Sequence, residues 1–393
     1  METSILSGLE ASKALYSSLE SRISHLKDHG IVPGLAAVLV GNNPASEIYV
    51  KNKTKKFESL GLKTDVFRLK ETVSEDELLS LISKLNTDTE FHGILVQLPL
   101  PKHIDSEKVL NAIIPTKDVD GFHPENAGLL SIGKPRFVPC TPKGIMFILR
   151  HFNIDLNGKH VVVIGRSNIV GRPISILASL KELGNATVTL CHSGTKDLKY
   201  FSKQADVLVA ALGSPEFVDS SYIKEGACLV DVGINRIEID GKSKIVGDVN
   251  QDSVTGIASS LTPVPKGVGP MTIAMLVENT VLSAELLLNW FLLAGDIMYK
   301  KLLFIILPFL LFSCTSNVDE EEVKKARQFF ESVFQDTVLD SPEFQASLGY
   351  KSNYDKWDDI TWQASRQRAY RAKDDLDYLE KNIDFDKLDE NTK

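Results

Sequence analysis

Tyr49 and Lys53 have types and a spacing that could perform chemistry. They lie four residues apart in the segment from Ala45 to Leu60, so they share one face of the helix that this segment predicts. A tyrosine ring offers a flat apolar platform with a polar tip, and a lysine beside other cations can serve as a base. The same spacing fits a basic, solvated helix face, and the residues alone leave both interpretations open.

Further polar side chains stand where a predicted strand and a predicted turn end. Gln97 closes an apolar strand that begins at Gly93, and α/β proteins bind ligands at the carboxyl ends of their parallel strands. Asp118 and Asp120 lie in the polar turn KDVDG. An amide that caps a turn, and aspartates that bond to their own backbone, are the structural alternatives.

Residues 161–173, VVVIGRSNIVGRP, have the layout of a phosphate-binding turn. A buried parallel strand is predicted from Val161 to Ile164, followed by a tight turn at Gly165 and an apolar helix over 174–180. This arrangement presents backbone N–H groups and a helix dipole to a phosphate. The spacing G-x-S-x-x-x-G differs from the common dinucleotide pattern, so an ordinary βα turn remains an alternative.

The next predicted strand, 186–191, indicates which nucleotide is bound. An NAD site usually has an acidic residue at this point, whereas here the strand ends in Cys191, His192 and Ser193. Arg166 lies in the preceding turn, and a cation with a hydroxyl suits a 2′-phosphate. The residues therefore favour NADP over NAD, with a solvated turn cation as the alternative for Arg166.

The order of the predicted elements indicates two parallel α/β lobes with a cleft between them. A surface helix is predicted from Ile5 to His29, and later helices are predicted to begin at the caps Ser46 and Thr141. A long apolar helix that runs to about Leu293 is expected to return to the first lobe.

The predicted fold class is α/β, with an extraneous helical C-terminal tail. The expected domains are a catalytic domain over 1–140 completed by helix 270–293, a Rossmann-like NADP-binding domain over 141–269, an apolar segment over 298–314 and an acidic tail over 315–393.

The composition of the 393-residue chain is that of a globular protein, with 43% hydrophobic and 24% charged residues. Its net charge of −8 argues against a nucleic-acid partner. The 4 cysteines are scattered without a C-x-x-C pair, which indicates reduced thiols in the cytosol, and we expect no metal site. The amino-terminal segment is an amphipathic helix rather than a signal peptide.

Seven segments, in order along residues 1–293, resemble the bifunctional methylenetetrahydrofolate dehydrogenase/cyclohydrolase family. The resemblance to the bacterial members of that family is close. These segments are VGNNPASEIYVKNK (40–53), GILVQLPLP (93–101), KDVDGFHPENAG (117–128), PCTPKGI (139–145), VVIGRSNIVGRP (162–173), DVGIN (231–235) and TPVPKGVGPMT (262–272).

The resemblance implies two linked reactions in one cleft. NADP takes a hydride from the methylene bridge of 5,10-methylenetetrahydrofolate, and water then opens the methenyl ring to give 10-formyltetrahydrofolate. It also implies a cytoplasmic homodimer in one-carbon metabolism, which supplies purine, histidine and methionine biosynthesis.

The resemblance also implies roles for individual residues. Lys53 is the catalytic lysine of the water-addition step, Gln97 orients it, Tyr49 lines the folate and Asp120 holds the pterin nitrogens, where a carboxylate can accept paired N–H bonds. The expected folate site comprises Tyr49, Lys53, Val96, Gln97, Leu98, Asp120, Pro265, Gly267 and Gly269. The expected NADP site comprises Gly165, Arg166, Ser167, Ser193 and Ile234, with Arg166 and Ser193 near the 2′-phosphate.

One position departs from the family pattern. The second glycine-rich loop of the family usually reads PVPGGVGP, and here Lys266 replaces its first glycine. Lys266 could restrict the backbone or could meet the glutamate tail of the folate, and the residues do not decide between these.

The residues from Met298 onward do not resemble that enzyme. A short basic start, the apolar run Leu302–Phe312 and Cys314 are similar to a bacterial lipoprotein signal peptide, in which Cys314 would carry the lipid. This run is too short for an ordinary membrane span, which needs about 20 residues. The acidic tail resembles the amino-terminal part of secreted bacterial proteins described as zinc peptidases, although it contains no H-E-x-x-H.

The tail permits two hypotheses. Two adjacent reading frames are joined in this chain, with Met298 as a natural start, and the solvated tail packs loosely against the body. The alternative is a membrane-associated fusion, anchored by residues 302–312, whose folate lobe only binds or tethers. Lys53 favours the enzyme, because a binding module has no need of a catalytic lysine.

Overall fold

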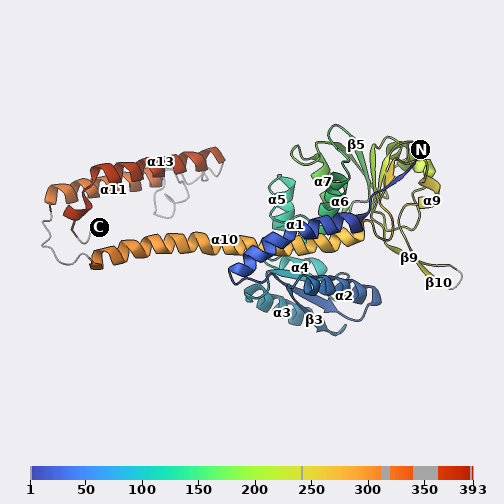
Figure 1. The fold of residues 1–393 in the computed structure, drawn as a ribbon, viewed down its shortest axis with the longest axis horizontal. Helices are drawn as coiled ribbons and strands as arrows, with labels where there is room; N and C mark the ends of the chain where they lie inside the picture. Colours follow the sequence, from blue (N-terminus) through green and yellow to red (C-terminus); the bar gives the residue numbers. More distant parts are fainter. Residues whose placement is uncertain (1, 240–241, 311–318, 340–361, 390–391, 393) are drawn as a thin grey trace. The chain divides into compact units, whose positions relative to one another are not determined.

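The computed structural model describes residues 2–239, 242–310, 319–339, 362–389 and 392 (Figure 1). The chain divides into two compact units, Met1–Asp296 and Ile297–Lys393.

The first sheet of the first unit has parallel strands in the order β3-β2-β4. The strands β2 (Gly34–Val40), β3 (Lys63–Leu69) and β4 (Gly93–Val96) are joined through α2 (Pro44–Ser59) and α3 (Glu75–Thr87). Every residue of β2 is buried, as expected for the run GLAAVLV at the centre of a parallel sheet. The predicted β-α-β-α-β order is confirmed. Because β2 has a neighbour on each side, its carboxyl end is a topological switch point where ligands bind.

The second sheet has, among the described residues, six parallel strands in the order β1-β11-β8-β7-β5-β6 (Figure 1). Its strands are β1 (Ser4–Ile5), β5 (His160–Ile164), β6 (Thr187–Cys191), β7 (Val207–Ala210), β8 (Cys228–Asp231) and β11 (Ser260–Leu261). Because β5 lies between β6 and β7, its carboxyl end is a second switch point. The predicted two-lobed α/β fold with a Rossmann-like second lobe is confirmed.

Shorter elements connect these strands. The helices are α4 (Ser106–Asn111), α5 (Pro124–Ser131), α6 (Cys140–His151), α7 (Gly171–Ser179), α8 (Leu198–Ser202), η1 (Ser220–Tyr222) and α9 (Gln251–Val254). An antiparallel hairpin of β9 (Asn235–Ile239) and β10 (Lys242–Val246) follows β8 and was not predicted.

The predicted start of the first helix at Ile5 is wrong. Helix α1 (Gly8–Asp28) begins three residues later, where the Ser7 hydroxyl accepts the Glu10 N–H at 3.3 Å. Ser4 and Ile5 instead form β1, in which Ser4 pairs with Ser260. The first residues of the chain therefore complete the second sheet, a pairing that a local pattern cannot reveal.

Two predicted helix caps are also wrong. The Asn43 side chain caps α2 by accepting the Ser46 N–H at 3.2 Å, and Pro44 takes the first helical position. Helix α6 begins at Cys140 without a side-chain cap, and the Thr141 hydroxyl instead hydrogen-bonds the Thr272 hydroxyl at 3.0 Å.

Helix α10 (Val268–Leu310) returns to the first lobe, as predicted, but its predicted end at about Leu293 is wrong, because the apolar residues that follow continue the helix to Leu310. The Ser283 hydroxyl donates to the carbonyl oxygens of His92 at 2.6 Å and Thr116 at 2.9 Å. Arg22 of α1 pairs with Glu285 of α10 at 2.6 Å, and α1 and α10 run side by side between the sheets (Figure 1). Within α10, the segment Val268–Asn289 is long and apolar enough to cross a membrane, but 61% of it is buried in the protein, as in the core helix of a globular domain.

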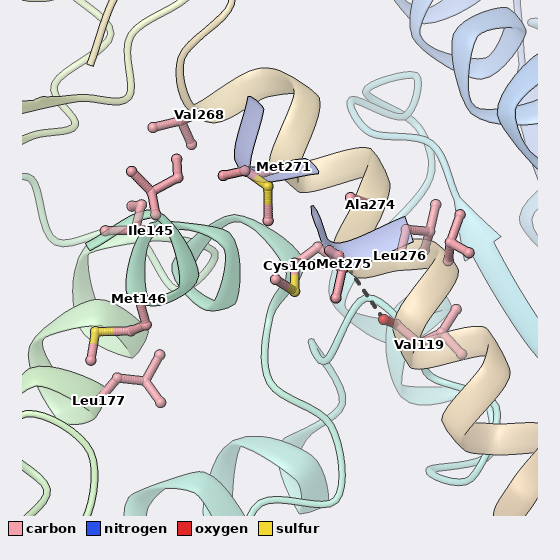
Figure 2. Packing of buried hydrophobic residues seen from close by; sticks show 14 of the residues in the cluster. Val119, Cys140, Ile145, Met146, Leu177, Val268, Met271, Ala274, Met275 and Leu276 are labelled. Atoms are coloured by element: carbon pink, nitrogen blue, oxygen red, sulfur yellow. Dashed lines mark hydrogen bonds between the residues drawn. The ribbon is translucent and has the colours of Figure 1, made fainter. Parts of the chain in front are cut away.

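A continuous apolar core joins the two lobes (Figure 2). Met271, Met275 and Leu276 of α10 pack beside Cys140 and Ile145 of α6, and all of them are buried. The same cluster includes buried residues of β2 in the first sheet and of β5 in the second. The core therefore holds both switch points in one compact unit.

The second unit contains the helices α11 (Glu320–Leu339) and α13 (Trp362–Asn382) and the short turn η2 (Phe385–Lys387). Its small core consists of Val323, Ala326, Ile383 and Leu388. Helices predicted for the tail are confirmed over these ranges. The expected lipid-bearing residue, Cys314, lies outside the described residues.

Candidate active site

Lys53 is a buried cation whose partner comes from the neighbouring strand. Only 7% of its surface is exposed, and its Nζ donates to Gln97 Oε1 at 3.2 Å. Gln97 follows β4 directly, where its backbone N–H bonds to the Val38 carbonyl at 2.9 Å. The Gln97 amide nitrogen donates to the Leu98 carbonyl at 2.8 Å, so its oxygen is left for the lysine. The two switch-point residues thus form one preorganised pair.

The two aspartates of KDVDG do different things. Asp118 is buried and accepts the backbone N–H groups of Phe122 and His123 and the side-chain amide of Asn126. Burial raises the pKa of the Asp118 carboxyl to about 6, although these hydrogen bonds act to lower it. Asp118 therefore builds the turn, as the structural alternative held, whereas Asp120 lines a cavity together with Lys53.

Cys140 belongs to the same cavity and was missed as a site residue. It is buried at the start of α6, and its thiol donates to the Val119 carbonyl at 3.4 Å (Figure 2). Burial, followed by the nearby Asp120 carboxylate, raises the pKa of the Cys140 thiol well above its ordinary value. The uncharged thiol therefore lines the cavity. The segment PCTPKGI, which contains Cys140, is the feature of the sequence that could have indicated this residue.

The catalytic cavity, of about 350 Å³, lies between the two lobes. Eight of the predicted site residues line this cavity. The first lobe contributes Tyr49, Lys53, Val96, Gln97, Leu98 and Asp120, the loop after β8 contributes Ile234, and α10 contributes Gly269. Tyr49 is 37% exposed, and burial of the rest raises the pKa of its hydroxyl, so the ring is a neutral platform. The predicted cleft is confirmed.

An adjoining cavity of about 600 Å³ holds the remaining predicted folate residues. Pro265 and Gly267 line it, and it shares Tyr49, Ile234 and Gly269 with the catalytic cavity. A ligand longer than the catalytic cavity can therefore continue past Tyr49 into the adjoining cavity.

The glycine turn after β5 has the backbone geometry that only glycine tolerates. Gly165 has a φ of 122°, and a Cβ there would lie 2.0 Å from the Ala211 carbonyl oxygen. A Cβ on Gly171, the first residue of α7, would lie 1.9 Å from the Gly165 carbonyl oxygen. The turn and the N-terminus of α7 are thus packed closely, and the surface that they present is backbone, which suits a phosphate.

Arg166 and Ser193 follow two neighbouring strands at the carboxyl edge of the second sheet. Ile164 of β5 pairs with Cys191 of β6, and each site residue comes two positions after its paired strand residue. Both are exposed, and Arg166 makes no ion pair with any residue that the structure describes. The hydroxyl of Ser167 is already engaged within the protein, because it accepts the N–H groups of Val170 and Gly171 at the start of α7.

A buried pair of aspartates behind Ile234 was also missed. Asp231 ends β8 and accepts the N–H groups of Gly233, Asp248 and Val249, so it fixes the turn that carries Ile234. Burial raises the pKa of the Asp231 carboxyl to about 7, against the effect of these bonds. The pair joins residues far apart in the chain, and nothing in the local pattern indicates it.

Asp248 fixes a second loop at the same edge of the sheet. Its carboxylate accepts the N–H groups of Leu212, Gly213 and Ser214, which follow β7, and the side-chain amide of Asn235. The two aspartates therefore hold the loops after β7 and β8 at the carboxyl edge, where nucleotides bind in folds of this class.

A Rossmann-like lobe with a glycine turn, facing a cavity that contains a buried lysine, defines a two-lobed nucleotide-dependent oxidoreductase. Comparison with known families identifies which one. Residues 6–120 match the catalytic domain of tetrahydrofolate dehydrogenase/cyclohydrolase, and residues 139–287 match its NAD(P)-binding domain. The chain belongs to the tetrahydrofolate dehydrogenase/cyclohydrolase family.

Individual relatives agree. The bifunctional protein FolD of Acetivibrio thermocellus is 51% identical over 286 residues, which cover 73% of this chain and 98% of the relative. The crystal structure of bifunctional FolD from Campylobacter jejuni is 50% identical with a TM-score of 0.68, over 72% of this chain and 99% of the other. The Trypanosoma brucei enzyme, solved with NADP and an inhibitor, is 35% identical with a TM-score of 0.69, over 72% of this chain and 98% of the other. The chain is accordingly an NADP-dependent bifunctional dehydrogenase and cyclohydrolase of folate one-carbon metabolism.

Proposed function

We propose that both reactions take place in the catalytic cavity and that Lys53 is the group that moves protons there. The observation that carries this proposal is the buried Lys53–Gln97 pair, at 3.2 Å, in the cavity that Asp120 also lines. Burial of a charged amine costs considerable free energy unless a partner compensates it. Here the partner is the neutral amide of Gln97. This arrangement holds the amine in place without neutralising it by a carboxylate.

The substrate is 5,10-methylenetetrahydrofolate, with its pterin ring at Asp120 and its aryl ring beside Tyr49. The Asp120 carboxylate accepts the paired N–H groups of the pterin edge, and Val96 and Leu98 line the ring. This pose places the one-carbon bridge toward Ile234 and the second lobe. The positions of Pro265, Gly267 and Gly269 support a continuation of the substrate into the adjoining cavity.

NADP, when bound, supplies the acceptor for the hydride that leaves the methylene bridge. Gly165 and the start of α7 fit its phosphates, because this surface is backbone and any Cβ at Gly165 would collide with Ala211. Arg166 and Ser193 would hold the 2′-phosphate, and Ile234 would pack against the nicotinamide end. Ser167 contributes through its hydroxyl, which accepts the N–H groups of Val170 and Gly171 and so fixes the turn before α7.

The second reaction adds water to the methenyl carbon. The ring opens to 10-formyltetrahydrofolate with release of one proton, and Lys53 transfers protons between the attacking water and the departing ring nitrogen. Gln97 acts as a positioning residue, since it holds the ammonium or amine of Lys53 by one hydrogen bond.

The test is an absorbance assay on the full chain with 5,10-methylenetetrahydrofolate and either NADP or NAD. Reduced cofactor and the methenyl compound are followed together. We expect rapid reduction of NADP, slow reduction of NAD and little lasting methenyl signal. A methenyl signal that decays no faster than without enzyme would show that the second reaction does not occur in this cavity.

The division of the chain into domains follows the same assignment. We propose that residues 1–140, with helix 270–293, bind the folate and that residues 141–269 bind NADP. We propose that the product supplies formyl groups and that the enzyme serves purine, histidine and methionine biosynthesis. We also propose that the enzyme is a cytoplasmic homodimer, which light scattering of the purified chain would test.

The tail is proposed to be foreign to this activity. The signal-like segment 298–314 and the acidic tail 315–393 represent a second reading frame that is joined to the enzyme, with Met298 as its natural start. Mass spectrometry of native cell lysate should find the enzyme and the tail as separate polypeptides. One intact polypeptide that partitions into membranes would instead support the membrane-associated fusion, in which residues 302–312 act as the anchor.

A further inference from the structure

A buried asparagine of α10, Asn279, makes contacts that the catalytic assignments do not use. Its side-chain amide nitrogen donates to the Val119 carbonyl at 2.8 Å and to the Val138 carbonyl at 3.0 Å. Val119 directly precedes Asp120, and Val138 precedes Cys140 by two residues. Both Asp120 and Cys140 line the catalytic cavity. One side chain of α10 therefore fixes the backbone next to two residues of the cavity wall.

Lys143 of α6 determines which way the Asn279 amide points. Its ammonium donates to Asn279 Oδ1 at 2.7 Å, and because an ammonium is a donor only, the amide oxygen must face it. The amide nitrogen is thereby turned toward the two backbone carbonyls, which are acceptors. Lys143 is itself held by an ion pair with Glu278 at 2.8 Å. These contacts fix a hydrogen-bond donor beside the turn KDVDG.

The Val119 carbonyl is the point at which Asn279 meets this turn. It accepts a second hydrogen bond from the Cys140 thiol at 3.4 Å (Figure 2). Without Asn279, this buried carbonyl would keep the thiol, which is a weak donor, and an unsatisfied buried carbonyl costs free energy. A shift of the turn would relieve that cost. Because the Val119 carbonyl and the Asp120 N–H share one rigid peptide plane, the shift would displace Asp120.

The other end of the turn is held from within. The Asp118 carboxylate accepts the N–H groups of Phe122 and His123, which follow Asp120. Asn279 holds the residue that precedes Asp120. Asp120 thus lies between two anchored positions of the chain, and one of these anchors comes from a helix more than a hundred residues away in the sequence.

We infer that Asn279 is a positioning residue of the active site: it holds the turn KDVDG so that the Asp120 carboxylate meets the pterin edge of the substrate, and Lys143 keeps its amide in the required orientation. This inference rests on the proposed function, which places the pterin at Asp120. Asn279 is not one of the described residues that line the catalytic cavity, so it acts through Asp120 rather than on the substrate.

The experiment is a double-mutant cycle on the full chain, in which calorimetry measures the dissociation constants of tetrahydrofolate and of NADP. The cycle comprises the wild type, Asn279→Ala, Asp120→Ala and the double variant. We expect Asn279→Ala to raise the constant for tetrahydrofolate about tenfold and Asp120→Ala to raise it about thirtyfold, because charge-assisted hydrogen bonds to the pterin are weakened or lost. The double variant should match Asp120→Ala, since Asn279 then has no carboxylate to position.

Two further variants separate the donor from the size of the side chain. Asn279→Asp keeps the size and the contact with Lys143 but replaces the donor by an acceptor, so it should weaken tetrahydrofolate binding as Asn279→Ala does. Lys143→Met frees the amide to turn and should weaken binding about threefold. In the dehydrogenase assay, Asn279→Ala should raise the KM for the methylene substrate, with kcat changed by no more than about threefold and the KM for NADP unchanged.

Ser283→Ala is the matched control. Ser283 is another buried residue of α10 that donates to two backbone carbonyls, but these belong to His92 and Thr116, outside the turn KDVDG. Its replacement should lower the midpoint of thermal unfolding as Asn279→Ala does, while tetrahydrofolate binding stays unchanged.

Two results would overturn the inference while the proposed function stands. One is equal weakening of tetrahydrofolate binding by Ser283→Ala and Asn279→Ala, which would make the role of Asn279 merely structural. The other is a double variant in which the separate effects of Asn279→Ala and Asp120→Ala multiply. Unchanged tetrahydrofolate binding by Asp120→Ala would instead contradict the proposed function itself.

Discussion

The two switch points of this enzyme use different parts of the polypeptide. At the carboxyl edge of the first sheet, the groups proposed to act on the substrate are side chains, above all the buried Lys53 and its partner Gln97. At the carboxyl edge of the second sheet, the surface after β5 that is proposed to bind NADP is backbone, and it is packed so closely at Gly165 that a methyl group cannot enter. A change of side chain should therefore remove chemistry in the first lobe without changing the fold. In the second lobe, an added atom should change both the fold and the binding of NADP.

Gly165→Ala should have the largest effect on the second lobe. The added Cβ would lie 2.0 Å from the Ala211 carbonyl oxygen at a φ of 122°, so we expect a loss of about 3 kcal/mol of stability and no measurable NADP binding. Thermal unfolding and NADP titration measure the two effects. Gly158→Ala is the control, because Gly158 also has a positive φ, 69°, but has open space around it. Equal effects of the two substitutions would show that the close packing is unimportant.

Asp231→Asn should change how stability depends on pH. Burial raises the pKa of this carboxyl from 3.8 to about 7, so the folded state holds a proton that the unfolded state releases. The protonated Asp231 carboxyl therefore contributes to the free energy of unfolding in full below about pH 4, and this contribution is lost as the pH rises through 7. Between pH 5 and 7, the free energy of unfolding of the wild type should fall by about 2 kcal/mol more than that of the variant.

Urea unfolding of both proteins at the two pH values measures this difference. The exposed Asp252→Asn variant should behave as the wild type does. Parallel pH dependence of the wild type and Asp231→Asn would contradict the assignment of the proton to Asp231.

Arg166→Gln should have the smallest effect of these substitutions. Arg166 is exposed and makes no ion pair with the described residues, so its removal should leave stability unchanged. The KM for NADP should rise about tenfold, while the KM for NAD stays constant, because only NADP carries the 2′-phosphate. Arg150→Gln, which removes an exposed cation of α6, is the control. A parallel rise for both cofactors would mean that Arg166 does not contact this phosphate.

The sequence predicted the parts of this protein that local patterns determine. Continuous apolar runs predicted β2 and β5, and the apolar segment after Gly269 predicted the return of α10. Because parallel strands bring their carboxyl ends to one edge, the cavity with Lys53 and Gln97 also followed from their positions.

Long-range contacts determine the parts that were wrong or missed. The strand of Ser4 and Ile5 depends on pairing with Ser260, and the hydroxyl of Thr141 bonds to Thr272 rather than capping its own helix. The roles of Asp231 and Asp248 depend on loops brought together only by the folded sheet. A resemblance between short segments marks such residues as part of a motif, but it does not show what they bond to.

Replacement of Lys53 by glutamine tests the central claim most directly. The full-length Lys53→Gln variant, with Lys55→Gln as its control, is supplied with 5,10-methylenetetrahydrofolate and NADP, and reduced cofactor and methenyl absorbance are recorded together. We predict that the variant folds, binds NADP as the wild type does and loses the cyclohydrolase reaction by about a thousandfold, so that any methenyl compound formed disappears only at its uncatalysed rate. Conversion of methenyl- to 10-formyltetrahydrofolate at the wild-type rate would contradict the claim that the side chains of the first lobe perform the chemistry.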